Sequence, residues 1–438
     1  MVWLLRVRRN VLTRIDPVTR GWAVVTSAGV IRLGLGLVAS LVIARALGPA
    51  DFGIYAVLAA TVAVVGGLAE GGLTEAAVLR ISGVDEQAAI ERGRAFFWLR
   101  LGLAAAVVAV GCAAAGPIAE RLLTVDQGLL RWALLGIVAT AASGAVSAVL
   151  QAIMAWQRMS SLTLVNTGLT AALALGLALL GRLDLLAALV VLGIGTSLVT
   201  FAVGRGMLPA GWSLRPPPLA TLRAEAAHLV RTGRWLWVAS VFAMLTSNAE
   251  VLLLNRQAAL PLVGAYALAL NLATKADLVN SSLYTVLLPG VAGLRDRAAV
   301  AGYVRRGFLR GGLIGLGLLL LIPIAEPLIV LIYGADFAPA VFFFRLLLGV
   351  MIFDVLLTPV LLLPLAYRQA RLLAAADVLR ALTLVLVALG LIPVYGAIGA
   401  IVARFAARVA GAVLVIAVLS LGRPALEVQH EEAPGVSQ

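Results

Sequence analysis

Long apolar segments, separated by short polar gaps, follow one another through most of the chain. A window of about 19 residues finds six such segments in each half, and each is near the ~20 residues that an α-helix needs to cross a bilayer. They cover roughly 22–46, 52–80, 95–118, 129–155, 160–181, 184–204, 234–255, 261–289, 307–333, 338–366, 370–392 and 396–421. The pattern predicts an all-α, polytopic membrane protein with about twelve transmembrane helices.

A motif between the first two segments has a weaker copy in the second half. Ala44–Ala56 reads ARALGPADFGIYA, and Asn255–Ala267 reads NRQAALPLVGAYA, so that Arg45 aligns with Arg256 at an offset of 256 − 45 = 211 positions. The same offset aligns Tyr55 with Tyr266, Trp156 with Tyr367, and Asn166 with Asp377. A constant offset at distant places predicts an internal duplication, with two six-helix bundles.

Arginines mark one side of the predicted membrane. They gather in the N-terminal stretch, in alternate gaps and in the segment between the halves, which predicts that both termini lie in the cytoplasm. An even number of spans per half inserts both halves in the same sense, so we expect a pseudo-twofold axis along the membrane normal. The predicted parts are a basic cytoplasmic tail (1–20), an N-terminal bundle (21–204), a cytoplasmic linker with an amphipathic helix (205–233), a C-terminal bundle (234–421) and a disordered cytoplasmic tail (422–438).

Composition excludes a soluble domain and a nucleic-acid-binding protein. Hydrophobic residues make up 62% of the chain and charged residues 13%, with a mean hydropathy of +1.05. The net charge of +13 comes from arginines in short gaps, which is typical of cytoplasmic anchoring and of contact with membrane lipids. The single Cys112 allows no intrachain disulfide, and the two histidines lie outside the spans, so we expect neither a histidine metal centre nor a cofactor.

Charged and small residues inside the first two spans are candidates for function, because charge in hydrocarbon normally faces a cavity or a partner. Arg32 shares a helical face with small residues and is a candidate for a wet cavity wall. Glu70 lies beside a cluster of glycines that weakens the helix, and it could be the counter-ion of Arg32 instead. The hinge candidates in this cluster are Gly66, Gly67, Gly71 and Gly72.

The second half carries a more polar set of candidates. Asn248 and Glu250 lie in its opening span, and Asn271, Lys275 and Asp277 lie in the next one. Lys275 and Asp277 are two positions apart and therefore point to different faces of a helix, so each needs another partner or water. A helix with two polar faces is not expected to face lipid on either.

Several strings resemble the oligosaccharide flippase branch of the multidrug/oligosaccharidyl-lipid/polysaccharide exporter superfamily. They are RALGPADFGIYA, AEGGL at Ala69–Leu73, NAEVLLLNR at Asn248–Arg256, and VGAYALA followed by VLLPGVAGL. The family usually has aspartate where this chain has Glu70 and Glu250. The resemblance implies two bundles forming a V around a central cavity and alternating access without enzymatic activity. The implied substrate is a polyprenyl-pyrophosphate-linked oligosaccharide, moved to the outer leaflet for surface polysaccharides such as O-antigen, lipopolysaccharide or exopolysaccharide.

The residues are compatible with that substrate. Arg32 and Lys275, in opposite halves, would compensate a diphosphate, since arginine offers a planar fork and lysine a point charge. Asparagine and serine would suit sugar hydroxyls. The coupling ion, a proton or sodium if any, and further polysaccharide-assembly proteins as partners are left open.

Three alternatives stay open. A drug/cation antiporter of the same superfamily would share the fold but would favour an acidic, aromatic-lined cavity. Lipid II flippases usually have two further spans, for which the chain has no room. A membrane-embedded glycan polymerase or ligase would need a long outward loop, and the outward gaps here are short.

Cysteine accessibility scanning tests the predicted orientation. Probes placed at Ser213, in the linker, and at Ser437, in the C-terminal tail, should not be labelled from outside intact cells. Labelling of either position from outside would overturn the orientation.

Overall fold

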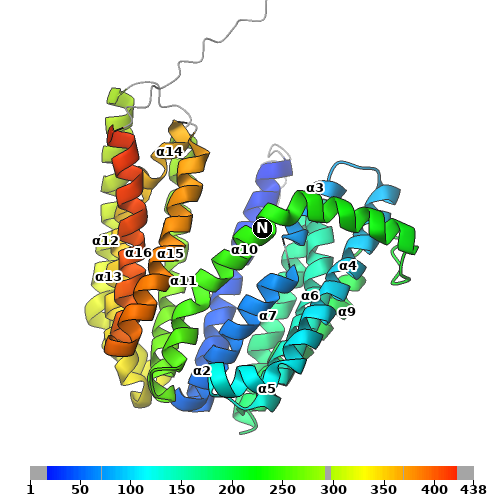
Figure 1. The fold of residues 1–438 in the computed structure, drawn as a ribbon, viewed down its shortest axis with the longest axis horizontal. Coiled ribbons are helices and arrows are strands. Elements are labelled where there is room, and N and C mark those ends of the chain that lie inside the picture. Colours follow the sequence, from blue (N-terminus) through cyan, green and yellow to red (C-terminus); the bar gives the residue numbers. More distant parts are fainter. Residues whose placement is uncertain (1–16, 71, 292–296, 368, 422–438) are drawn as a thin grey trace, which may run out of the picture. The chain divides into compact units, whose positions relative to one another are not determined.

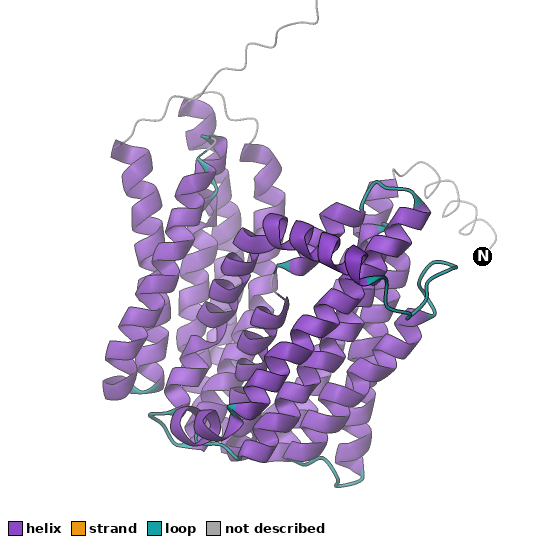
Figure 2. Ribbon diagram, turned by 45° about the vertical axis from the view of Figure 1, so that its right-hand side comes forward, coloured by secondary structure: helices purple, strands orange, loops and turns teal. Residues whose placement is uncertain are grey.

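The computed structural model describes residues 17–70, 72–291, 297–367 and 369–421, and every regular element in these ranges is helical (Figures 1 and 2). The elements up to residue 256 are α2 (Pro17–Glu70), α3 (Leu73–Ile81), α4 (Glu86–Ala113), α5 (Ala115–Ile118), η1 (Ala119–Leu123), α6 (Gln127–Ala152), α7 (Trp156–Leu179), α8 (Leu185–Ala187), η2 (Ala188–Gly195), α9 (Thr196–Arg205) and α10 (Leu219–Asn255). Those after it are α11 (Leu260–Val291), α12 (Arg297–Tyr333), η3 (Ala335–Phe337), α13 (Ala338–Leu361), α14 (Leu363–Ala366), α15 (Ala370–Tyr395) and α16 (Ala397–Leu421).

The number of spans agrees with the apolar pattern. Ten helices among the described residues are long and apolar enough to cross a membrane. The first of these candidates, Ser27–Glu70, has 44 residues and holds two spans joined at a kink. The 32-residue α11 adds one more, which gives the twelve predicted. The prediction of an all-α polytopic membrane protein is confirmed.

The kink in α2 falls inside the motif that ends the first apolar segment. Gly48 has φ 71° and ψ 173°, a conformation that only glycine adopts readily, and Pro49 follows it. Helical geometry resumes directly, so the two spans turn without a loop. In the second copy of the motif, α10 ends at Asn255 and α11 begins at Leu260, and Tyr266 is fully buried. Both copies therefore join the first and second spans of their half.

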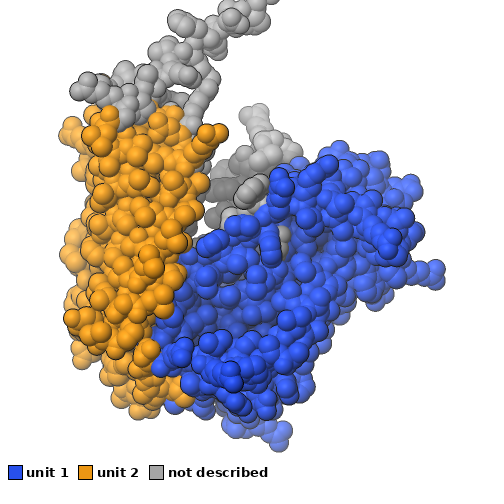
Figure 3. Space-filling model, in the orientation of Figure 1, with its two compact units in different colours: residues 1–256 blue, residues 257–438 orange. Residues whose placement is uncertain are grey.

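The chain forms two compact units, residues 1–256 and 257–438 (Figure 3). The predicted amphipathic helix (219–232) and the seventh span (234–255) are one continuous helix, α10, which belongs to the first unit. Glu225, near its start, pairs with Arg80 at the end of α3, with 3.3 Å between Nη2 and Oε1. The domain boundaries expected from the sequence stay a prediction; in the described structure, the break between compact units follows α10.

The packing of helix pairs repeats at the offset of 211. In unit 1, Gly144 of α6 lies under the Arg100 guanidinium of α4, where an added Cβ would be 2.7 Å from Nη2. The equivalent pair in unit 2 is Gly311 of α12 against Val355 of α13, where an added Cβ would be 2.9 Å from the Val355 carbonyl oxygen. In each pair a glycine packs against a larger residue. In unit 1 the glycine lies on the later helix of the pair, α6, whereas in unit 2 it lies on the earlier helix, α12.

Further contacts repeat in the same register. Gly111 packs against the Leu134 side chain, and Arg345, at the position equivalent to Leu134, donates from Nε to the carbonyl of Ile322 at 3.0 Å. The Ser147 hydroxyl donates to the Ser143 carbonyl at 3.3 Å, and the equivalent Thr358 donates to the Asp354 carbonyl at 2.9 Å. The duplication predicted from the sequence is thus present in the internal packing of each unit. The direction of the axis relating the units stays a prediction.

Three glycines of unit 1 allow α10 to approach α2 and α3 closely. A Cβ at Gly67 would be 2.9 Å from Met244 Cγ, and one at Gly72 would be 2.5 Å from the Trp237 backbone nitrogen. Gly233 lies against the Gly72 carbonyl, where an added Cβ would be 3.2 Å from the oxygen. The Trp237 indole also donates to the Leu68 carbonyl at 3.2 Å. These residues form a glycine seam, defined as the contact of Gly67 and Gly72 with Gly233, Trp237 and Met244.

Substitution of Gly72 by alanine should destabilise the protein. Gly72 has φ 59°, so an alanine there combines backbone strain of about 1–2 kcal/mol with an overlap on α10. Gly66→Ala is the matched control, because Gly66 is helical and nothing lies within 4 Å of its added Cβ. We expect a lower melting temperature in detergent for Gly72→Ala only. Equal melting temperatures for the two variants would contradict the seam.

Candidate functional site

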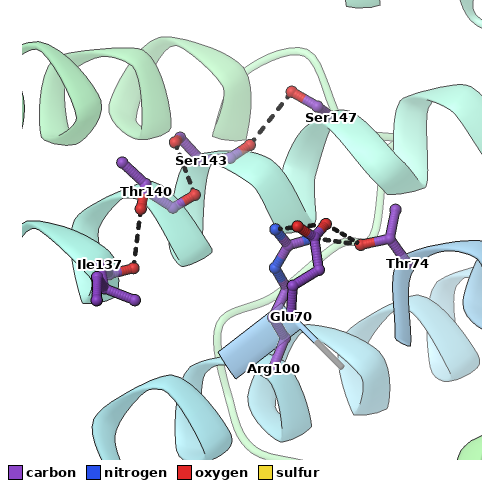
Figure 4. Close-up of polar contacts among 7 residues, drawn as sticks. All are labelled: Glu70, Thr74, Arg100, Ile137, Thr140, Ser143 and Ser147. Carbon is purple, nitrogen blue, oxygen red and sulfur yellow. Dashed lines mark hydrogen bonds and ion pairs between the residues drawn. The ribbon is translucent and has the colours of Figure 1, made fainter. Parts of the chain in front are cut away.

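A charged cluster lies inside unit 1 at the end of α2. The carboxylate of Glu70 is 3.2 Å from Nη2 of Arg100 on α4, and it accepts a hydrogen bond of 2.8 Å from the Thr74 hydroxyl on α3. Arg100 closes the triangle, because its Nη1 donates to the same hydroxyl at 2.6 Å. Three helices thus contribute one polar side chain each to a single network (Figure 4).

The break between α2 and α3 places Glu70 in this cluster. The left-handed conformation of Gly72 ends the helical path of α2 and starts α3 on a new course. Thr74, four positions after Glu70, therefore returns toward the carboxylate. Gly66, Gly67 and Gly72 surround this break, and Gly71 lies outside the described residues. Their role as a hinge stays a prediction, while the structure gives Gly67 and Gly72 a packing role in the glycine seam.

Arg100 is the buried member of the cluster. Its side chain is 10% exposed, whereas that of Glu70 is 42% exposed. The guanidinium packs against Gly144 and lies 6.0 Å from the centroid of the Phe96 ring. Only a glycine at position 144 leaves room for this head group. The nearby hydroxyls of α6 donate to carbonyls of their own helix (Figure 4): Thr140 to Ile137, Ser143 to Thr140, and Ser147 to Ser143.

The geometry can hold a partly exposed carboxylate in a fixed position. Arg100 compensates the charge of Glu70 from the buried side, and Thr74 fixes one oxygen. The exposed part of the carboxylate remains able to accept hydrogen bonds from a hydroxyl-rich ligand or to hold a cation. No group of three or more His, Cys, Asp or Glu residues among those described could hold a metal ion.

Sequence reasoning missed Arg100. The alternative that Arg32 is the counter-ion of Glu70 is wrong, because the described structure pairs Glu70 with Arg100. Arg32 is exposed in the first half of α2. A usable signal was present, since Arg100 is a charged residue inside the third apolar segment. Its partners lie 30 and 26 positions away in sequence, so no helical spacing could identify them.

The candidates at the end of α10 have different environments. Asn248 is half-buried and donates to the Met244 carbonyl at 2.8 Å, within its own helix. Glu250 is completely buried. Asn255, the last residue of α10, donates from Nδ2 to the Leu123 carbonyl at the end of the π-helical segment η1. Asn255 therefore ties α10 to the rest of unit 1.

The candidates on α11 lie in unit 2. Asn271 and Lys275 are half-buried, and the Thr274 hydroxyl donates to the Asn271 carbonyl at 2.8 Å. The side chain of Asp277 lies outside the described residues. Arg32 and Lys275 belong to different units, so their placement on one cavity stays a prediction.

Unit 2 has its own ion pairs, at positions equivalent to neutral residues of unit 1. Arg408 of α16 pairs with Asp354 of α13 at 3.1 Å, where unit 1 has Ser197 and Ser143. Arg380 pairs with Asp377 of the same helix at 3.1 Å. The Arg408–Asp354 pair joins α16 to α13 within unit 2, whereas the Arg380–Asp377 pair lies within α15.

Loss of Arg100 should destabilise the protein more than loss of an exposed pair. Arg100→Met leaves Glu70 without its ion pair, and we expect a loss of about 1–3 kcal/mol of unfolding free energy. This is below the ~3–5 kcal/mol of a fully buried pair, because Glu70 is partly exposed. Arg100→Met/Glu70→Gln should recover part of the loss.

The control for that experiment is Glu326→Gln, which leaves the hydrogen bond from Arg345 to the Ile322 carbonyl in place. Arg345 pairs with Glu326 at 3.3 Å, with side chains 36% and 66% exposed, so the pair should contribute at most about 1 kcal/mol. Thermal unfolding in detergent measures all variants. If Arg100→Met is no more destabilising than Glu326→Gln, the cluster does not stabilise unit 1.

Solved structures with a similar fold include a flippase and transporters. The chain is similar to a lipid II flippase MurJ in an inward closed conformation, with a TM-score of 0.66, 13% sequence identity, and coverage of 91% of this chain and 87% of that one. It is also similar to an inward-facing multidrug resistance MATE family transporter of the MOP superfamily (TM-score 0.63, 16% identity, 89% and 94% coverage). A eukaryotic MATE transporter gives a TM-score of 0.59 at 15% identity, with 93% and 97% coverage.

Sequence comparison gives the family. No curated protein sequence matches the chain at the significance required. A family described as polysaccharide biosynthesis protein (Polysacc_synt_3) matches residues 42–341, which is more than half of the chain. The match begins within α2 and extends into α13, so it includes the Glu70–Thr74–Arg100 cluster and runs into both units. The protein therefore belongs to the Polysacc_synt_3 family of polysaccharide biosynthesis proteins.

Proposed function

We propose that the protein moves a polyprenyl-pyrophosphate-linked oligosaccharide across the bacterial inner membrane by alternating access, for surface polysaccharide biosynthesis. The match to a polysaccharide biosynthesis family over residues 42–341 carries this proposal. The likeness to a lipid II flippase supports a lipid-linked substrate, because that protein's substrate also has a lipid portion. Both termini would lie in the cytoplasm, and other polysaccharide-assembly proteins would be partners.

The chemistry of such a substrate sets the requirements of the site. Its diphosphate and sugars cannot cross hydrocarbon unaided, since burial of unpaired charge is very costly. Its polyprenyl tail can stay in the lipid throughout. The protein therefore has to offer cations to the diphosphate and hydrogen-bonding groups to the sugars, while the tail needs no enclosed path.

Three cations inside the spans differ in what they can do for this substrate. Arg100 is buried and committed to Glu70 and Thr74, so it holds the site in shape. Arg32 is exposed on α2, and Lys275 is half-buried on α11. In the proposal, Arg32 and Lys275 compensate the diphosphate from the two units, and Glu70 accepts hydrogen bonds from sugar hydroxyls. A coupling proton or sodium ion would act on the exposed part of the Glu70 carboxylate.

The second candidate function is a cation-coupled drug antiporter of the same superfamily. The likeness to multidrug resistance MATE transporters favours it. The two functions make different demands on the cations, because a cationic drug would be repelled by Arg32 and Lys275 while a diphosphate would be attracted. The same variants therefore separate the two functions.

Transport of labelled lipid-linked oligosaccharide into the opposite leaflet of proteoliposomes tests the proposal. Arg32→Gln and Lys275→Gln should each lower the rate about ten- to a hundredfold, the range of a lost charged hydrogen bond of ~1.5–3 kcal/mol. Arg32→Lys and Lys275→Arg should insert normally but also transport more slowly, because the planar guanidinium of arginine and the compact ammonium of lysine bind phosphate with different geometry. Arg182→Gln, in the exposed turn after α7, is the control and should transport normally.

Two results would overturn the proposal. Wild-type protein that moves no lipid-linked oligosaccharide but exchanges a cationic drug for protons or sodium would favour the antiporter. Full transport by Arg32→Gln and Lys275→Gln variants of normal abundance would remove the diphosphate role from these residues.

A further inference from the structure

A groove with apolar walls lies on unit 1, and its lining does not include Glu70, Thr74 or Arg100. It has a volume of about 470 Å³ and is formed by α4, α6, η2, α9 and the segment before α10. Its lining includes Phe97, Leu101, Ala139, Leu198, Phe201 and Leu214. The volume falls within the roughly 300–1,000 Å³ of ligand sites. The groove is therefore large enough for an elongated apolar group.

The groove is open to the surface of unit 1. Leu135 of α6 and Leu198 of α9, which both line it, are 42% and 51% exposed in the complete chain. Both residues lie within candidate membrane spans, so their exposed surface faces an apolar environment. An open, apolar groove at membrane depth suits a hydrocarbon chain, which can enter sideways from the bilayer.

One end of the groove is strongly basic. Leu214 closes this end, and its neighbour Arg215 is exposed. Arg94, one turn of α4 before Phe97 and Trp98, donates from Nη2 to the Arg215 carbonyl at 2.6 Å. Arg205, one turn of α9 after the lining residue Phe201, is also exposed, and Arg158 donates to the carbonyl of Met207 just beyond α9 at 3.0 Å. Four arginines thus gather where the apolar walls end, with Glu91 as a nearby exposed acid on α4.

Unsatisfied donors lie in the same region. Among the described residues, the indole nitrogens of Trp98 and Trp212 and Nε of Arg94 are buried without a hydrogen-bond acceptor. Trp98 lines the groove, and Trp212 covers Gly93 of α4, where an added Cβ would be 2.8 Å from its ring. All three groups are hydrogen-bond donors, so this end of the groove lacks hydrogen-bond acceptors.

We infer that the groove binds an anionic phospholipid, with one acyl chain between α4, α6 and α9 and the phosphate at Arg94, Arg205 and Arg215. Charge complementarity selects this occupant, because a zwitterionic lipid would bring a cation to the arginines. Phosphate and ester oxygens supply acceptors on the side where the protein has only donors. The side is the one that the arginine distribution predicts to be cytoplasmic. The inference does not depend on the substrate proposed above, because the groove lies within unit 1 and needs no contact from unit 2.

Lipid retention by the purified full-length protein tests the inference. Native mass spectrometry after delipidation should show phosphatidylglycerol bound about tenfold better than phosphatidylcholine with the same acyl chains. Arg205→Gln/Arg215→Gln should abolish this preference. Its matched control is Arg305→Gln/Arg306→Gln, which removes the same charge from two exposed arginines of α12 and should leave the preference intact. Ala139→Phe, which fills the groove, should lower the binding of both lipids.

A second readout requires no change to the arginines. Phosphatidylglycerol with brominated acyl chains should quench the fluorescence of Trp98, and Trp98→Phe should remove that part of the quenching. Equal retention of the two lipids, or a preference lost equally in both double-arginine variants, would overturn the inference. Displacement of phosphatidylglycerol by a polyprenyl diphosphate at stoichiometric concentration would also overturn it and assign the groove to the transport substrate.

Discussion

Hydrocarbon supplies no hydrogen-bond partner, so each break in a membrane helix has to be satisfied by the protein itself. The chain meets this constraint at the end of α2, where Gly72 turns the backbone inside the bundle. Glu70, Thr74 and Arg100 then satisfy one another across three helices. Arg100 can enter the bundle only because Gly144 leaves space on α6. The cluster is thus a consequence of the break, and the partly exposed carboxylate of Glu70 is available for function.

The two units share their packing but not their polar chemistry. In unit 1 Arg100 packs on Gly144, and at the equivalent positions of unit 2 Gly311 packs on Val355. Each contact therefore has one glycine, but the glycine comes from the other helix of the pair. Where unit 2 pairs Asp354 with Arg408, unit 1 has two serines whose hydroxyls donate to carbonyls of their own helices. Close packing conserves the sum of volumes at a contact, while paired charges can be replaced by self-satisfied hydroxyls. Duplication therefore left a common scaffold with a different charged cluster in each unit.

The sequence predicted what depends on local pattern. Apolar length predicted the spans, and a constant offset predicted the repeat that the contacts of Arg345 and Thr358 reproduce. The sequence could not predict which charged residues form ion pairs. The partners of Arg100 lie on other helices, and more than one charged residue could have paired with Glu70. The sequence also separated the amphipathic helix from the seventh span, since the polarity changes at residue 233 while the backbone of α10 continues. Periodicity reports the environment of a helix face and not the continuity of the backbone.

Helix α10 connects the internal repeat with the Glu70 cluster. By the internal repeat α10 carries the first span of the second half, yet it packs within unit 1 through the glycine seam with Gly67 and Gly72. The seam and the Glu70 cluster share the same backbone break, because Gly72 contacts α10 on one side and leads into Thr74 on the other. A ligand or ion that pulls on Glu70 therefore acts on a segment that also holds α10. In the proposed alternating access, this link would let a change at the carboxylate alter the packing of α10, the helix that precedes α11.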